Sequence, residues 1–122
     1  MDGMQPREGS IVEADGSCNL KLSAEMLDLV ASRFRTLGEP YRLRILQVLR
    51  PGAMTVGQIV EILDGNQPNI SRHLQNLHQA GIVSRRRDGS SIIYSLVNPE
   101  VLKLCELVHR NLAKKRIGSR AR

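Results

Sequence analysis

Apolar residues recur at spacings of three and four along five stretches of the chain, and residues that start or stop helices bound these stretches. The first stretch begins after Ser23 and ends at Gly38, and the second opens at Pro40. A capping box of Thr55 and Gln58 starts the third. The pattern predicts helices over residues 24–37, 41–49, 56–63, 67–80 and 99–112. In the second helix, the residues expected to face inward are Leu43, Ile45, Leu46 and Leu49, and those expected to face outward are Arg42 and Arg44.

Between the fourth and fifth helices the pattern changes to two β-prone runs, residues 82–87 and 92–97. They flank the turn-forming sequence Asp88-Gly89-Ser90-Ser91, so we expect an antiparallel hairpin. The predicted fold class is mainly α with a small β-hairpin (α+β). We expect one domain over residues 23–113, preceded by a flexible arm over residues 1–22 and followed by a basic tail over residues 114–122.

The fourth helix has an apolar stripe on one side and short polar side chains on the other. Asn66 is a favourable N-cap, Pro68 is tolerated in the first turn, and Gly81 supplies a left-handed stop. The stripe that faces the core is Ile70, Leu74, Leu77 and Ala80. The side chains outside this stripe, which suit contacts with base edges or phosphates in a major groove, are Gln67, Asn69, Ser71, Arg72, Gln75 and Asn76.

The sequence on either side of this helix favours DNA binding over a merely solvated surface. The third and fourth helices are joined by a tight turn over residues 64–66, as in a helix-turn-helix, where the first helix braces the second against the groove. The hairpin that follows carries Arg85, Arg86 and Arg87 beside its tip, and strand alternation turns at least one of them to each face. A run of charges is usually only a solvated surface. A basic hairpin placed directly after a helix-turn-helix, however, is typical of a wing that contacts the phosphate backbone.

Composition narrows the partner to double-stranded DNA. The formal net charge is +6, and residues 65–122 hold eleven basic and three acidic side chains. Aromatic residues make up only 2%, which argues against recognition of single strands by base stacking. Two cysteines, Cys18 and Cys105, are too few for a disulfide framework, and no stretch resembles a signal peptide or a membrane span. We expect a cytoplasmic protein with reduced thiols and no membrane partner.

Several motifs together resemble the ArsR/SmtB family of winged helix-turn-helix repressors, over about residues 25–112. The matching segments are Leu37-Gly38-Glu39-Pro40-Tyr41-Arg42-Leu43-Arg44-Ile45-Leu46, Ile70-Ser71-Arg72-His73-Leu74, Ala80-Gly81-Ile82-Val83 and Gly89 with Tyr94-Ser95-Leu96. The resemblance implies a homodimer held by the first and last helices. It also implies binding to an inverted-repeat operator, with two recognition helices about 34–36 Å apart, and release by a chemical signal.

The metal sites that the resemblance implies are missing from the sequence. Members that bind arsenic or cadmium carry paired cysteines in the third helix, whereas this chain has no ligand over residues 54–60. Members that bind zinc use an Asp and two His with an acidic residue beyond, and the matching positions here are Asn98, Glu100, Asn111 and Lys114. His73 and His78 are five apart and share no helical face, so we expect His73 to support the recognition helix or to contact a phosphate.

Three interpretations of Cys105 stay open. It can be an inert buried residue, since free cysteines often are. It can sense persulfide or oxidants by thiol modification, although related sensors pair it with a cysteine in the second helix and only Cys18 is available here. It can also bind a metalloid or soft metal with His109, four residues away on one helical face, and with Cys18.

The leading functional hypothesis is therefore a DNA-binding repressor, and two other classes compete with it. A winged-helix module that binds proteins would show no sequence-selective DNA binding. An enzyme is the weakest hypothesis, because the sequence holds no Gly-rich phosphate loop, nucleophile–base pair or carboxylate pair on a predicted cleft.

Overall fold

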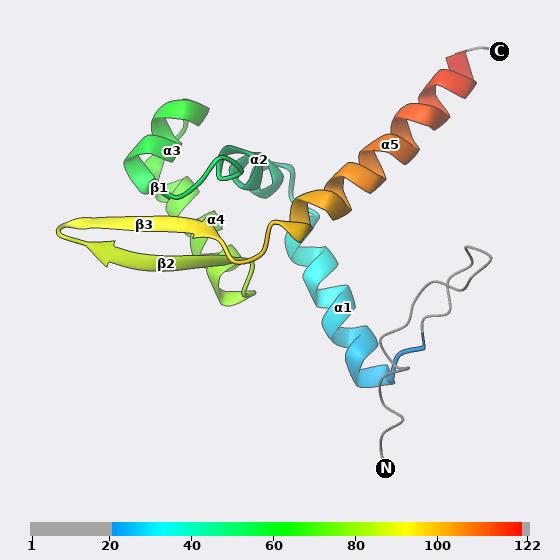
Figure 1. The fold of residues 1–122 in the computed structure, drawn as a ribbon, viewed down its shortest axis with the longest axis horizontal. Coiled ribbons are helices and arrows are strands. Elements are labelled where there is room, and N and C mark those ends of the chain that lie inside the picture. Colours follow the sequence, from blue (N-terminus) through cyan, green and yellow to red (C-terminus); the bar gives the residue numbers. More distant parts are fainter. Residues whose placement is uncertain (1–20, 121–122) are drawn as a thin grey trace. The chain divides into compact units, whose positions relative to one another are not determined.

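The computed structural model describes residues 21–120, and for residues 116–120 it describes the backbone alone. The elements are α1 (Ala24–Leu37), α2 (Pro40–Val48), β1 (Met54–Thr55), α3 (Val56–Leu63), α4 (Gln67–Gln79), β2 (Val83–Asp88), β3 (Ser91–Leu96) and α5 (Glu100–Arg120) (Figure 1). The chain divides into two compact units, Met1–Phe34 and Arg35–Arg122. The predicted helices and the predicted hairpin are confirmed, and most helix ends agree within one residue. The predicted flexible arm lies almost wholly outside the described residues.

Local hydrogen bonds set the start of most helices. In α1, the Ser23 hydroxyl accepts a bond of 3.1 Å from the Met26 amide. In α3, the Thr55 hydroxyl accepts from the Gln58 amide at 3.1 Å and the Gln58 side chain accepts from the Thr55 amide at 2.9 Å, which completes the predicted capping box. Such bonds satisfy amides that have no partner within the helix.

The sheet has three strands rather than the two that the sequence predicted. Its order is β1-β3-β2, with both pairs antiparallel. In β1, Met54 pairs with Tyr94 and Thr55 pairs with Ile93. A two-residue strand is too short to show the alternation by which strands are recognised in a sequence, so only the tertiary structure reveals it. The hairpin of β2 and β3 runs beside α3 and α4, and its tip projects beyond them (Figure 1).

The hydrophobic core lies among α2, α3, α4 and the sheet, with α4 packed against α2, α3 and β2. The fully buried side chains are Ile45, Leu46, Leu49, Ile59, Ile70, Leu74, Leu77 and Val83. The prediction that Leu43 faces inward is wrong, since this side chain is 37% exposed on the α5 side of α2. Among the described residues, no helix is long and apolar enough to cross a lipid bilayer.

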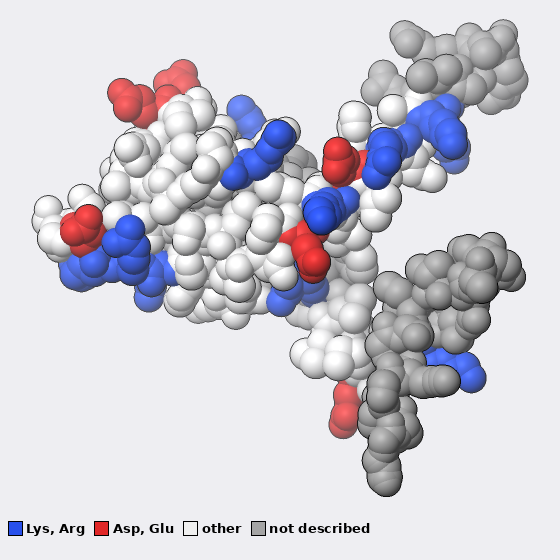
Figure 2. Space-filling view, viewed as in Figure 1, with Lys and Arg blue, Asp and Glu red and all other residues white. Residues whose placement is uncertain are grey.

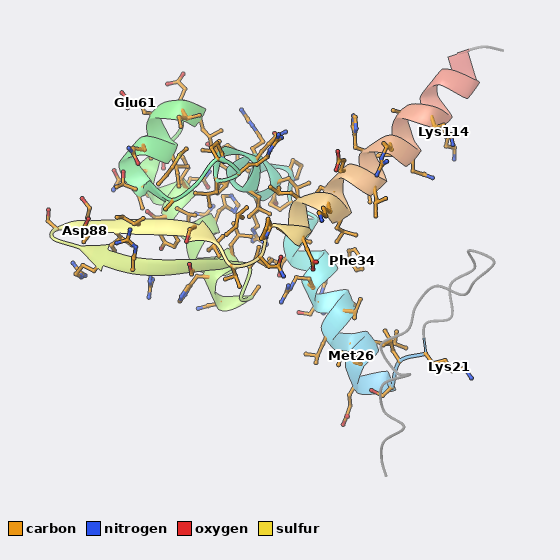
Figure 3. The ribbon with its side chains drawn as sticks, viewed as in Figure 1. Lys21, Met26, Phe34, Glu61, Asp88 and Lys114 are labelled. Carbon is orange, nitrogen blue, oxygen red and sulfur yellow. The ribbon has the colours of Figure 1, made fainter. Side chains whose placement is uncertain are left out.

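Helix α5 continues past the predicted end near residue 112 and reaches Arg120. Residues 113–116 are Ala-Lys-Lys-Arg, all good helix formers, and no stop signal precedes Gly118. Basic side chains near a helix C-terminus also interact favourably with the helix dipole. Part of the predicted basic tail is therefore helical, and Lys114 projects from this extension (Figure 3).

Candidate nucleic-acid interface

Helix α4 has strong signals at both ends. The Asn66 side chain accepts a hydrogen bond of 2.9 Å from the Asn69 amide, so the predicted N-cap is confirmed. At the other end Gly81 has a φ of 78°, a conformation that glycine adopts without strain. The Gly81 amide donates to the His78 carbonyl and the Ile82 amide to the Leu77 carbonyl, each at 3.0 Å. This Schellman motif ends α4 and turns the chain into β2.

The two faces of α4 differ sharply. Ile70, Leu74 and Leu77 have no exposed surface, as the sequence predicted. The opposite face is solvent-exposed and consists of Pro68, Arg72, Gln75 and Gln79. Of the other predicted DNA contacts, Gln67 is exposed, whereas Asn69 and Ser71 are half-buried on the flanks. Gln79 also lies on the exposed face. It is not among the predicted contacts, because it is far from the N-terminal turns of the helix, which usually reach the bases.

Arg72 is held in place by its own helix. Its Nη2 donates a hydrogen bond of 2.6 Å to Oδ1 of Asn69, one turn earlier. The same oxygen would accept from an adenine amino group, and its bond to Arg72 leaves it one lone pair for that contact. Arg72 keeps its remaining guanidinium donors for a guanine or a phosphate. In this arrangement Asn69 orients the guanidinium of Arg72.

His73 occupies a buried position at the base of α4. It is 8% exposed, its Nδ1 accepts a hydrogen bond of 3.2 Å from Nε of Arg42, and its ring centroid lies 5.5 Å from that of Tyr41. Burial lowers the pKa of His73 below its ordinary value, nearby Arg42 and Arg72 lower it further, and Glu39 acts in the opposite direction. This burial favours the supporting role of His73 over the predicted contact with a phosphate.

Arg42 faces inward, so the prediction that it points to solvent is wrong. Besides its bond to His73, it donates from Nη1 to the Thr36 carbonyl at 3.1 Å. The sequence holds a signal for this orientation. Arg42 lies three residues before Ile45 and four before Leu46, both fully buried, so it shares their helical face. Because Arg42 is charged, a search for apolar residues at helical spacing does not include it in the buried face of α2.

The hairpin presents three arginines. Arg85, Arg86 and Arg87 are all exposed, and they pair across the ladder with Tyr94, Ile93 and Ile92 in that order. Because cross-strand partners share a face, Arg85 and Arg87 lie on the Tyr94 face and Arg86 on the other, as strand alternation predicted. Basic side chains gather around the hairpin tip, where Asp88 also lies (Figures 2 and 3). Glu61, on α3, lies away from this cluster (Figure 3).

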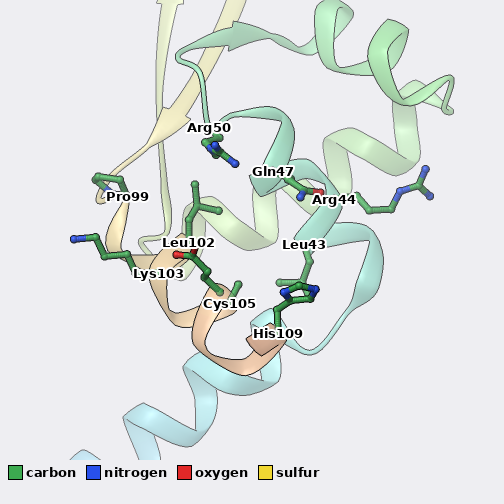
Figure 4. Close-up of a pocket in the computed structure, with 10 residues that line it drawn as sticks. Leu43, Arg44, Gln47, Arg50, Pro99, Leu102, Lys103, Cys105 and His109 are labelled. Atoms are coloured by element: carbon green, nitrogen blue, oxygen red, sulfur yellow. The ribbon is translucent and has the colours of Figure 1, made fainter. Parts of the chain in front are cut away.

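Cys105 lines a pocket of about 620 Å³ between α2 and α5. Figure 4 shows its side chain near Leu102, Leu43 and His109. Burial raises the pKa of Cys105, which keeps the thiol protonated and slow to react, although a backbone hydrogen bond acts in the opposite direction. The predicted partner Cys18 lies outside the described residues. Within residues 21–120, no group of three His, Cys, Asp or Glu side chains could hold a metal ion.

Comparison with known proteins identifies the family. The family model described as bacterial regulatory protein, arsR family, matches residues 39–85. The HTH-type transcriptional regulator Rv0081 of Mycobacterium tuberculosis is 36% identical over 93 residues, which cover 75% of this chain and 82% of that protein. The probable mercury resistance operon repressor of Streptomyces lividans is 37% identical over 99 residues, covering 81% of this chain and 74% of that protein.

Solved structures agree with these relatives. The crystal structure of Rv0081 has a TM-score of 0.69 and 33% identity, covering 82% of this chain and all of that one. The homodimeric winged helix-turn-helix DNA-binding domain of Mb0332 from Mycobacterium bovis has a TM-score of 0.66 and 32% identity, covering 77% of this chain and 86% of that one. Together with α3, α4 and the arginine hairpin, they establish that this chain is a winged helix-turn-helix transcriptional regulator, not an enzyme, and a member of the ArsR family of bacterial regulatory proteins.

Proposed function

We propose that this protein is a homodimeric repressor that binds an inverted-repeat operator in double-stranded DNA. The observation that carries the proposal is the pairing of an exposed polar face on α4, with Arg72 oriented by Asn69, and a basic wing over Arg85–Arg87. Base edges in the major groove require such polar side chains, and phosphates require such cations. The proposed contacts are Gln67, Asn69, Ser71, Arg72, Gln75, Arg85, Arg86 and Arg87.

Exposed apolar side chains support the homodimer. In α1, Met26, Leu27, Leu29 and Phe34 are 44 to 64% exposed. In α5, Leu107, Val108 and Leu112 are 50 to 58% exposed. Large apolar side chains grouped on a helix face mark protein interfaces. The Mycobacterium bovis neighbour is described as homodimeric, and two-fold symmetry would suit an inverted repeat with half-sites about 34–36 Å apart.

Fluorescence anisotropy with promoter-derived and random duplexes tests the DNA contacts. We expect Arg72→Ala to weaken operator binding by about 1–3 kcal/mol while leaving random DNA less affected. Replacing all three wing arginines by Ala should weaken binding to both duplexes and lower the salt slope by about 0.9 for each phosphate that the wing no longer neutralises. Arg50→Ala, an exposed arginine at the end of α2, is the matched control. If the Arg72 and wing variants bind like this control, the proposed reading surface is wrong.

We propose that the release signal acts through Cys105. The pocket between α2 and α5 has room for a group added to its sulfur, which supports thiol modification by persulfide or oxidants. The raised pKa counts against rapid thiolate chemistry. Intact mass followed by operator binding tests this after polysulfide, peroxide, arsenite or mercury(II) treatment. Mercury(II) is included because the Streptomyces lividans relative is a probable mercury resistance operon repressor. If Cys105→Ser keeps the full response to all four reagents, the thiol has no sensing role.

A further inference from the structure

The Arg42 side chain connects two elements at the base of the recognition helix. Its Nε donates to Nδ1 of His73 in α4 at 3.2 Å, and its Nη1 donates to the Thr36 carbonyl at 3.1 Å. Thr36 is in the last turn of α1. A guanidinium can make both bonds because its donors diverge from one rigid plane. Arg42 therefore ties the end of α1 to α4.

The bond between Arg42 and His73 exists only while the imidazole is neutral. Arginine cannot accept a hydrogen bond, so Nδ1 of His73 must accept and the ring proton lies on Nε2. A second proton would occupy Nδ1, break this bond and place a cation against Arg42. Arg72 adds further repulsion, Glu39 opposes it, and the Tyr41 ring at 5.5 Å adds no charge.

The same helix carries the supporting histidine and the proposed contact residue. His73 directly follows Arg72 in α4, and Arg72 is oriented by Asn69 within this helix. A tilt of α4 at His73 therefore moves the guanidinium of Arg72 relative to the groove. Preorganised contacts bind more tightly because less conformational freedom is lost on binding.

We propose that Arg42 is a positioning residue for operator recognition, which holds α4 in its DNA-reading orientation through neutral His73 and makes operator affinity sensitive to acid. This inference rests on the proposed function, in which α4 reads the operator. It assigns a role in DNA binding to two side chains that do not touch DNA.

Operator affinity of the full-length protein between pH 8 and pH 5 tests the role of His73. In His73→Asn, the amide oxygen replaces Nδ1 as an acceptor and does not titrate. We expect this variant to match the unmodified protein within about twofold at pH 7.5. At pH 5 we expect the unmodified protein to bind more weakly than the variant, since protonated His73 cannot accept the bond from Arg42. His78 and His109 are present in both proteins, so the difference isolates His73. Superimposable pH profiles would overturn the proposal.

Substitutions of Arg42 test the second half of the inference. Arg42→Lys keeps the charge but loses the divergent donors, and we expect operator affinity at pH 7.5 to fall at least several-fold and the acid sensitivity to disappear. Arg50→Lys, the same change at an exposed arginine, is the matched control. Thermal unfolding identifies temperatures at which every variant is folded. If Arg42→Lys binds the operator with normal affinity and normal pH dependence, the positioning role is wrong. The proposed function would still stand in that case if Arg72→Ala weakens operator binding.

Discussion

Gly65, in the turn between α3 and α4, permits a close approach that no other residue allows. A Cβ atom at this position would overlap the Tyr41 hydroxyl and would lie 2.8 Å from Cδ1 of Ile70. Ile70 is fully buried, so neither neighbour can move without disturbing the core or the ring contact between Tyr41 and His73. Because overpacking of this kind costs about 1–3 kcal/mol, we expect Gly65→Ala to lower the free energy of unfolding by that amount.

Gly57, in α3, offers a control with the same chemical change. Its added Cβ would meet only the Thr55 hydroxyl at 3.9 Å, which is ordinary contact. An alanine inside a helix is favoured over glycine, so Gly57→Ala should raise the free energy of unfolding by about 0.5–1 kcal/mol. Thermal unfolding at fixed protein concentration should show Tm lower by about 4–20 °C for Gly65→Ala and higher by a few degrees for Gly57→Ala. Equal Tm shifts in the two variants would refute the steric argument.

Four further predictions concern single features. Asn66→Ala removes the N-cap of α4 and should lower the free energy of unfolding by about 1 kcal/mol in urea titrations, with an unchanged m-value. The pKa of His73 is lower in the folded than in the unfolded chain, so the unfolded state binds more protons below pH 6.5. Stability should therefore fall as the pH drops below 6.5, by at most about 1.4 kcal/mol per pH unit, and His73→Asn should flatten this slope in pH-dependent urea titrations. Val108→Glu should shift sedimentation from dimer to monomer, whereas Lys103→Glu on the same helix should not, and equal behaviour would count against the α5 interface. Deletion of residues 114–122 should weaken binding to random and operator DNA about equally and reduce its salt dependence, and selective loss of operator binding would contradict a non-specific role for the tail.

Features that depend on neighbouring residues in the chain were predicted well. The capping box of Thr55 and Gln58, the Asn66 cap and the Gly81 stop each involve groups within a few residues of one another. Their geometry is nearly the same in any helix, so the residue types alone identify them. The buried stripe of α4 followed for a similar reason, because a regular helix places residues three and four apart on one face.

Errors arose where a side chain meets a distant part of the chain. The charge of Arg42 predicts exposure to solvent, yet a carbonyl and an imidazole from two other elements each accept a hydrogen bond from it. The apolar side chain of Leu43 predicts a place in the core, yet it borders the open pocket between α2 and α5. Residue type is only a statistical guide to burial, since a buried charge is tolerated wherever partners are supplied.

By itself, the sequence determined the order of helices and hairpin, the boundaries of the recognition helix, and the concentration of positive charge in the second half of the chain. These properties follow from local hydrogen bonding, periodicity and counting. Only the tertiary structure decided that β1 joins the sheet, that Asn69 holds Arg72, and that His73 is buried against Arg42 and Tyr41. The physical reason is that helix period fixes which residues share a face, whereas side-chain rotamers and packing against other elements fix which groups meet.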